Sequence, residues 1–257
     1  MNDEVVVITG ASAGIGAALA QRVGREGGRV VLVARREAEL REVAGRSGKD
    51  ALPVVADVTR REDVERVLKE ALARFGHVDV WINNAGRGIS KPVTQLTDDD
   101  FDEMMRVNVK SALYGMQTVV PHFQQRGAGH LINISSMLGR IPMVPFRSAY
   151  NAAKHALNAL TANLRMELHE RHPGIHVSTV LPGVVATEFG LNALGGGPDS
   201  RTLPGGQSAE EVAAVILDVI ERPRADVYTR PEFRQQAAAY YGAEDMGEFE
   251  ARLVMRR

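Results

Sequence analysis

The stretch "VVVITGASAGIG", residues 5–16, places a β-branched run directly before a glycine-rich turn. Glycine suits a turn where the backbone must approach a phosphate, because a side chain would block that approach. The helix that follows would offer free amides and the positive end of its dipole. A glycine triplet alone is equally typical of an ordinary strand-to-helix turn, but its place after the first strand favours a dinucleotide site. The candidate contacts are Gly10, Ser12, Gly14, Ile15 and Gly16.

Short apolar runs recur along the chain and alternate with segments of helical period. They are continuously apolar, which predicts strands covered on both faces. This alternation indicates a parallel sheet with helices on both sides, either an open doubly wound sheet or a closed eight-fold barrel. The glycine turn favours the open, Rossmann-type α/β fold, with three layers (α/β/α) and a single domain over residues 1–257. The expected strands are residues 5–9, 29–34, 51–56, 78–83, 130–135, 176–181 and 225–229.

Composition excludes several classes of protein. Hydrophobic residues make up 44% of the 257 residues and charged residues 25%, as in soluble globular proteins. The formal net charge of -1 gives no basic excess for a nucleic-acid partner. There is no cysteine, and hence no disulfide or thiolate chemistry. Without a basic, apolar leader or a run of about 20 apolar residues, we expect a cytoplasmic protein with no membrane partner.

The end of the second strand bears on the choice of dinucleotide. An acid there would bind the adenosine ribose, whereas a basic residue would accommodate a 2′-phosphate. Ala34 and Arg35 occupy these positions, and arginine can make a forked, charge-assisted contact to phosphate. Glu37 could still reach a ribose, but two residues later it fits the first turn of a helix better. The sequence therefore favours NADP(H).

Two segments near the C-terminus differ from the alternating pattern. Glycines and prolines cluster in residues 190–207, so we expect a mobile substrate loop over about residues 188–207. A helix is predicted over 208–222, before the last short strand. The charged tail, residues 230–257, has no assignable fold.

Tyr150 and Lys154 stand one helical turn apart, which places them on one face of a helix. Alone, this spacing is modest evidence for chemistry, but several motifs accompany it. They are "TGASAGIG" at 9–16, "DVT" at 57–59, "NNAG" at 83–86, Asn108 in "VNVKSA", "ISS" at 134–136, and "PG" at 182–183 followed by Thr187. In order and spacing this set resembles the short-chain dehydrogenase/reductase family over about residues 5–230.

The resemblance implies a catalytic group of four residues. Tyr150 would be the general acid in carbonyl reduction or the base in alcohol oxidation. Its phenol, with a usual pKa near 10, needs a neighbour that favours the anion, and Lys154 would supply that charge and also bind the nicotinamide ribose. Ser136 would hydrogen-bond the substrate oxygen. Asn108 would join a water to Lys154, with a buried structural amide as the alternative.

The resemblance also implies the remaining cofactor contacts, in addition to Tyr150 and Lys154. Asp57 and Val58 would meet the adenine. The residues of "NNAG" would lie against its ribose and stabilise the central sheet: Asn83, Asn84, Ala85 and Gly86. After the sixth strand, the segment that would contact the nicotinamide carboxamide comprises Pro182, Gly183, Val185 and Thr187.

No metal site is expected. His169, His172 and His176 cluster near the end of the long helix, where a favourable dipole explains them better than metal ligation does. The acidic stretch "TDDDF", residues 97–101, fits a helix start with Thr97 as the cap.

The favoured function is an NADPH-dependent reductase that transfers a hydride between the nicotinamide and a carbonyl or alcohol substrate. An NAD-dependent alcohol dehydrogenase and a non-catalytic NADP-sensing protein are the alternatives. The apolar residues flanking the site predict an apolar substrate; they are Met137, Leu138, Met143, Val144, Phe146, Phe189 and Leu191. A homodimer or homotetramer is expected, although the long tail puts the family's usual tetramer in doubt.

Overall fold

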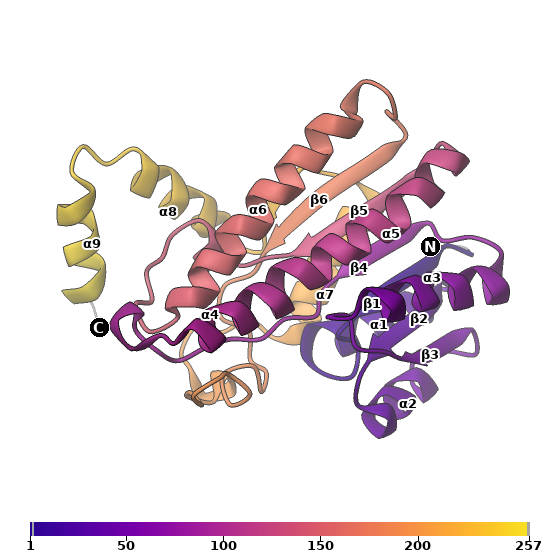
Figure 1. Cartoon of the computed structure of the whole chain (residues 1–257), viewed down its shortest axis with the longest axis horizontal. Coiled ribbons are helices and arrows are strands. Elements are labelled where there is room, and N and C mark those ends of the chain that lie inside the picture. The colour runs from indigo at the N-terminus through magenta and orange to yellow at the C-terminus, as the bar shows by residue number, and fades with distance from the viewer. Residues whose placement is uncertain (2, 256–257) are drawn as a thin grey trace.

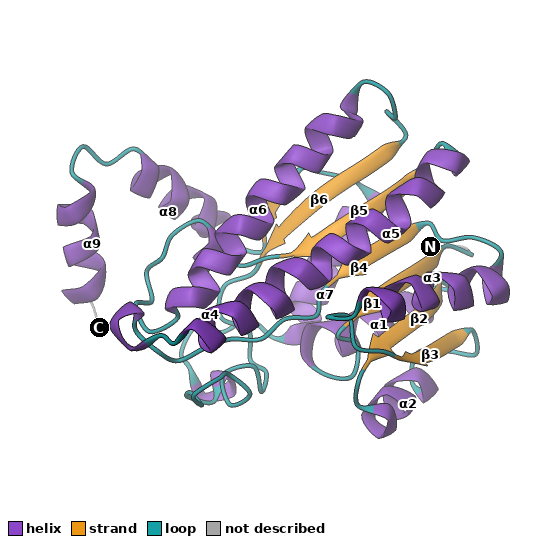
Figure 2. Ribbon diagram, in the orientation of Figure 1, coloured by secondary structure: helices purple, strands orange, loops and turns teal. Residues whose placement is uncertain are grey.

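The apolar runs form one parallel sheet in the computed structural model, which describes residue 1 and residues 3–255. The sheet has seven strands in the order β3-β2-β1-β4-β5-β6-β7 (Figures 1 and 2). Every neighbouring pair is parallel, which confirms the open doubly wound sheet. The strands are β1 (Val5–Thr9), β2 (Arg29–Ala34), β3 (Ala51–Val55), β4 (Val80–Asn83), β5 (Gly129–Ile134), β6 (Ile175–Leu181) and β7 (Asp226–Tyr228).

The strand order reverses at β1, which pairs with β2 on one side and with β4 on the other. A crevice forms at such a switch point, outside the carboxyl ends of the strands. The glycine-rich turn follows β1 and the "NNAG" stretch begins at the end of β4, so both reach this crevice. Pro53 lies in the edge strand β3, where its missing N–H costs the sheet least.

Helices cover both faces of the sheet. On the face toward the viewer in Figure 1 lie α3 (Arg61–Phe75), α5 (Ser111–Arg126) and α6 (Ser148–His169). Behind the sheet lie α1 (Gly14–Arg25) and α7 (Ala209–Glu221), with α2 (Glu37–Gly45) beside β3. Each face has its own buried apolar core, because the strands alternate their side chains between the two sides.

Local signals fix several helix ends. Thr97 caps α4 (Asp98–Met105) in a reciprocal capping box with Asp100, as the acidic stretch predicts. Ser208 and Glu211 form the same box at the start of α7. Gly76 ends α3 in the left-handed conformation, with φ +83°.

The helix α4 does not stop at Met105 but continues through a π-helical segment, Arg106–Lys110, into α5. A π-helical turn inserts an extra residue into the hydrogen-bond ladder and is frequent at functional sites. Asn108 lies in this segment and is buried. The sequence pattern gave no sign of this irregularity.

The tail forms two helices, α8 (Pro231–Tyr241) and α9 (Met246–Met255). Their apolar side chains pack against Met137, Ile141 and Met143, which lie in the segment that follows β5. Three short 3₁₀ turns complete the described structure: η1 (Val93–Gln95), η3 (Met137–Gly139) and η4 (Ser200–Thr202). Among the described residues, no helix is both long and apolar enough to span a membrane.

Candidate active site

The glycine turn has the shape of a phosphate cradle. Gly10 and Gly14 have φ of +67° and +55°, which side chains rarely adopt. A Cβ on Gly10 would lie 2.8 Å from the Cα of Ala85, and one on Gly16 would lie 2.4 Å from the oxygen of Gly10. The first turn of α1 carries no acidic residue. The backbone amides there therefore remain suited to an anionic pyrophosphate.

The side chain of Asn84 holds the glycine turn in place through hydrogen bonds. Its Nδ2 donates to the backbone oxygen of Thr9 at 2.8 Å and to that of Gly10 at 3.2 Å. In return, the Thr9 hydroxyl accepts from the backbone N–H groups of Asn84 and Ala85. From the sequence we expected Asn84 to lie against the adenosine ribose. In the structure its side-chain amide instead bonds the glycine turn. Thr9 was not among the candidates, because its role depends on a contact 75 residues away.

Asn83 points into the sheet rather than to the crevice. It accepts from the indole Nε1 of Trp81 at 2.9 Å and donates to Asn133 at 2.8 Å. Asn133 in turn donates to Thr161 on α6 at 2.9 Å. This buried chain of hydrogen bonds joins β4, β5 and α6, which agrees with the expectation that Asn83 stabilises the central sheet.

Charged residues gather where the adenosine end of a dinucleotide would lie. Asp57 accepts from the backbone and the side chain of Thr59. Burial raises the pKa of Asp57, but these hydrogen bonds and the charge of Arg35 outweigh that effect and leave it below its usual value. Arg35 is exposed directly after the end of β2, and its charge acts on Asp57.

Arg36 is a second arginine at this position. Its Nη2 donates to the hydroxyl of Ser12, in the glycine turn, at 3.1 Å, and Nη1 forms an ion pair with Glu39 at 3.4 Å. Arg35 was a candidate from the sequence, whereas Arg36 was not. The doubled arginine in "ARRE" was the available signal.

The segment after β6 lies across the crevice from the glycine turn. A Cβ on Gly14 would lie 3.2 Å from the Thr187 Cγ2, so the two segments meet. Val185 is held in an isolated bridge to Gln207. The oxygen of Pro182 accepts from the backbone N–H of Met137 at 2.8 Å. Sequence positions far apart thus converge on one edge of the sheet.

Tyr150 lies in the first turn of α6 with 7% of its surface exposed. Burial raises the pKa of its phenol to about 12, against the opposing effects of a hydrogen bond with the Ser136 side chain and the charge of Arg147. Ser136 also accepts from the backbone N–H of Leu138 at 3.1 Å, which orients its hydroxyl. The phenol is therefore protonated at neutral pH in the protein without a bound cofactor.

Lys154 is buried one turn along α6. Its Nζ donates to the backbone oxygen of Ile134 at 2.9 Å and lies 5.6 Å from the centre of the Tyr150 ring. Burial lowers the pKa of Lys154 to about 8. Ser136 and Arg147 act to lower the pKa of Tyr150, and the expected effect of Lys154 on this phenol stays a prediction.

Asn108 holds the chain beside these residues. Its Nδ2 donates to the backbone oxygen of Arg87 at 2.9 Å, and its Oδ1 accepts from the N–H of the same residue at 3.2 Å. A Cβ on Gly86 would lie 2.9 Å from this Oδ1 and 3.6 Å from the Nζ of Lys154. Asn108, Gly86 and Lys154 therefore meet, and the amide has a structural role here.

The segment 188–207 covers Tyr150. The ring of Phe189 packs edge-on against the Tyr150 ring, with 5.5 Å between centroids. Leu194 exchanges backbone hydrogen bonds with Gly88 and Ser90, which ties the loop to the chain after β4. Tyr150 is enclosed by these contacts.

The expected apolar substrate residues divide between two places. Leu138 and Phe189 pack in the cluster that contains Tyr150 and Ile89. Met137 and Met143 instead pack with the tail helices. Leu191 is 47% exposed. Fewer apolar residues therefore line the space beside Tyr150 than the sequence predicted. Some of the expected ones are covered by α8 and α9, for which the sequence predicted no fold.

The three histidines do not converge. His169 ends α6, whereas His176 lies in β6, where its ring packs edge-on against His130. Burial and the neighbouring His176 lower the pKa of His130 to about 3. No cluster of three metal-ligating side chains occurs within the described part of the chain.

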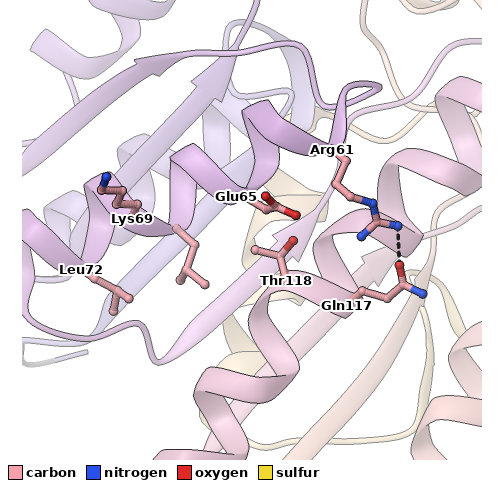
Figure 3. Close-up of a pocket in the computed structure, with 7 residues that line it drawn as sticks. Arg61, Glu65, Lys69, Leu72, Gln117 and Thr118 are labelled. Carbon is pink, nitrogen blue, oxygen red and sulfur yellow. Dashed lines mark hydrogen bonds between the residues drawn. The ribbon is translucent and has the colours of Figure 1, made fainter.

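A separate groove lies between α3 and α5 (Figure 3). Arg61 donates to the Oε1 of Gln117 at 2.7 Å across it and stacks over the ring of Tyr114. Leu68 and Leu72 form its apolar wall. The groove belongs to the outer surface of the helical layer, not to the crevice above β1 and β4.

Comparisons with known proteins agree with this geometry. A family model described as short chain dehydrogenase matches residues 4–193. An uncharacterized oxidoreductase of Staphylococcus aureus (strain USA300) is 34% identical over 225 residues, covering 87% of this chain and 94% of its own.

Two solved structures are also similar. A short-chain dehydrogenase/reductase from Burkholderia phymatum in complex with NAD has a TM-score of 0.86 and 25% identity, covering 93% of each chain. A short-chain dehydrogenase from Sphingobium yanoikuyae in complex with NADPH has a TM-score of 0.80 and 33% identity, covering 93% of this chain and 92% of its own. With its sequence match and its parallel sheet, the chain belongs to the short-chain dehydrogenase/reductase family of oxidoreductases.

Proposed function

We propose that this protein reduces a carbonyl substrate with NADPH and that Tyr150 is the general acid. The observation that carries the proposal is the meeting of a buried phenol, its Ser136 hydrogen bond and the buried Lys154 at the edge of the sheet that holds the glycine turn. When bound, the nicotinamide cofactor supplies the hydride for reduction or accepts it in oxidation.

The residues of the chain would divide the remaining work. Ser136 would hold the substrate oxygen, and Tyr150, neutral because burial raises its pKa, would give that oxygen its proton. Lys154 would bind the nicotinamide ribose and help to restore the proton of Tyr150. Asn108, through its hold on Arg87, would keep the neighbouring chain in place. The loop 188–207 would exclude water after substrate binding.

The remaining candidate contacts would hold the cofactor. Ser12 and Ile15 would meet the pyrophosphate with the glycines, while Val58 and Asp57 would meet the adenine. Arg35 and Arg36 support the choice of NADP(H), because a guanidinium bonded to Ser12 and a second one whose charge acts on Asp57 suit a 2′-phosphate. NAD-dependent alcohol oxidation remains the second candidate, since one similar structure was solved with NAD. Asn84, Ala85, Gly86, Pro182, Gly183, Val185 and Thr187 complete the proposed set.

The test is NADPH consumption over a panel of ketones and aldehydes, repeated with Tyr150→Phe. The proposal requires turnover by the wild type and a large loss in the variant, with NADPH affinity kept. Turnover that Tyr150→Phe leaves intact would show that another group donates the proton. Tight cofactor binding without any turnover would favour the sensing protein.

We further propose a homodimer or homotetramer in the cytoplasm, as one domain over residues 1–257. Met166 on α6 is 67% exposed, and the groove of Figure 3 opens on the same face of the sheet. These features support α5 and α6 as the subunit contact. Sedimentation of the wild type and of Met166→Glu tests this assembly, because the acid should shift the protein toward monomer.

A further inference from the structure

Arg147, the residue immediately before α6, is a buried cation that the proposed mechanism does not use. Only 8% of its surface is exposed. Its Nη1 donates to the backbone oxygen of Ile89 at 3.1 Å. Burial lowers the pKa of Arg147, and the one titratable group found to act on it within the described chain is Tyr150. It therefore lies near the phenol without a carboxylate partner.

The surroundings of this guanidinium contain a second unused donor. A Cβ on Gly88 would lie 2.8 Å from Nη1, and one on Gly197 would lie 3.3 Å from Nη2. The same position on Gly197 is 2.9 Å from the hydroxyl of Ser90. That hydroxyl is buried and has no hydrogen-bond partner among the described residues. Arg147 and Ser90 thus share one site beneath the loop 188–207.

Burying Arg147 and Ser90 in this way costs folding free energy unless an anion binds them. A buried charge without a partner and a buried hydroxyl without a hydrogen bond each cost free energy. Guanidinium groups bind carboxylates through two parallel hydrogen bonds, and a hydroxyl can add a third. The Phe189 ring packs against the Tyr150 ring and lies close to Gly88, so the site adjoins the proposed substrate position.

We propose that Arg147 and Ser90 bind a carboxylate of the substrate, so that the protein acts on keto acids and their hydroxy acids. This inference rests on the proposed reductase function. The reaction adds a hydride to the ketone carbon and a proton to its oxygen, and the carboxylate is unchanged. Glycine at positions 88 and 197 keeps side chains of these residues away from the guanidinium, because a Cβ would crowd Nη1 and Nη2.

The test uses oxopentanoates with the ketone at successive positions, each paired with its methyl ester. The wild type should show a higher kcat/KM for at least one acid than for its ester. Arg147→Met should lower this acid-to-ester ratio by roughly 10- to 100-fold, the worth of a hydrogen bond to a charged group. Arg147→Lys should recover part of the ratio, and Ser90→Ala should lower it less. Arg46→Met, an exposed arginine at the end of α2, should not change it.

Binding of the same acids and esters to the NADPH-bound protein, measured by calorimetry, separates the two proposals. If the acids bind preferentially and need Arg147, but no compound turns over, the carboxylate site stands and the reductase function fails. If neutral ketones turn over while acids neither bind better nor respond to Arg147→Met, the carboxylate site fails alone. A shift of the pH profile that is equal for acid and ester, with their ratio unchanged, would also overturn it, because Arg147 would then act on Tyr150. NADPH affinity checks that each variant is folded.

Discussion

The ammonium of Lys154 donates a hydrogen bond to the backbone oxygen of Ile134 and faces the ring of Tyr150 from 5.6 Å. It is thus fixed to the end of β5 rather than paired with an acid. Because burial lowers its pKa to about 8, Lys154 changes charge close to neutral pH. The candidate site therefore contains one group, Tyr150, that stays protonated at neutral pH and one, Lys154, that titrates close to it.

We predict that Lys154 makes stability depend on pH. Its pKa is about 8 in the folded state and near 10.5 when exposed, so the unfolded chain binds more protons between these values. The free energy of unfolding should therefore rise with pH from about 8 to about 10, by up to roughly 3 kcal/mol. Urea titrations across this range should show the rise in the wild type and a smaller one in Lys154→Met. Lys69→Met, at an exposed position of α3, should keep the full rise, and an equal slope in both variants would contradict the assignment.

Removal of the Tyr150 hydroxyl should stop catalysis without releasing the cofactor. Tyr150→Phe keeps the ring that packs against Phe189, so the fold should survive. Loss of a general acid typically lowers the rate by about 10²- to 10⁴-fold. Single-turnover rates should show this loss, while fluorescence titration with NADPH should give an unchanged Kd. Tyr241→Phe, at an exposed tyrosine of α8, provides the matched control.

The two arginines after β2 should set the cofactor preference. Replacing Arg35 with Asp and Arg36 with Ala removes the guanidinium that bonds Ser12 and the one whose charge acts on Asp57. Each lost charge-assisted contact to a phosphate is worth about 1.5–3 kcal/mol, so NADPH should bind at least 10-fold more weakly. NADH affinity should change little or improve. Arg41→Met, an exposed ion-paired residue on α2, is the control, and higher wild-type affinity for NADH would reject the NADP(H) assignment.

Glycine should be required at position 10 but not at position 45. Gly10→Ala forces a side chain into a φ of +67° and within 2.8 Å of Ala85, so it should lower stability by roughly 1–3 kcal/mol and weaken cofactor binding. The same substitution at Gly45, within α2, meets no atom within 4 Å. There we expect a gain of about 0.5–1 kcal/mol. Urea unfolding measures both, and tolerance of Gly10→Ala would contradict the cradle geometry.

Local patterns predicted the fold because each strand and helix is specified within its own few residues. The runs at 5–9 and 29–34 became β1 and β2 with unchanged bounds, and Thr97 capped α4 as its acidic neighbours indicated. The π-helical turn around Asn108 could not be predicted, since no periodic signal distinguishes one extra residue in a helix. The helices α8 and α9 could not be predicted either. Their few apolar residues become buried only by packing against Met137 and Ile141, which are distant in the sequence.

The site residues show the same division. Motif order led to Tyr150, Lys154 and Ser136, whose proposed roles the structure leaves to experiment. Arg147 was not found from the sequence. What singles it out is burial without a carboxylate partner within the residues that the structure describes, and this can be recognised only in the folded chain. Asn84 was placed against the cofactor, yet its bonds to Thr9 and Gly10 depend on two segments meeting in space.

The contact between Gly183 and Phe233 has a consequence for how the enzyme is made. A Cβ on Gly183 would lie 2.4 Å from the Phe233 ring, so α8 rests on the segment proposed to meet the nicotinamide. During translation Phe233 leaves the ribosome after all the residues proposed for the site. A nascent chain can thus fold most of its sheet and still lack this support, so it should gain full competence only once Phe233 has left the ribosome.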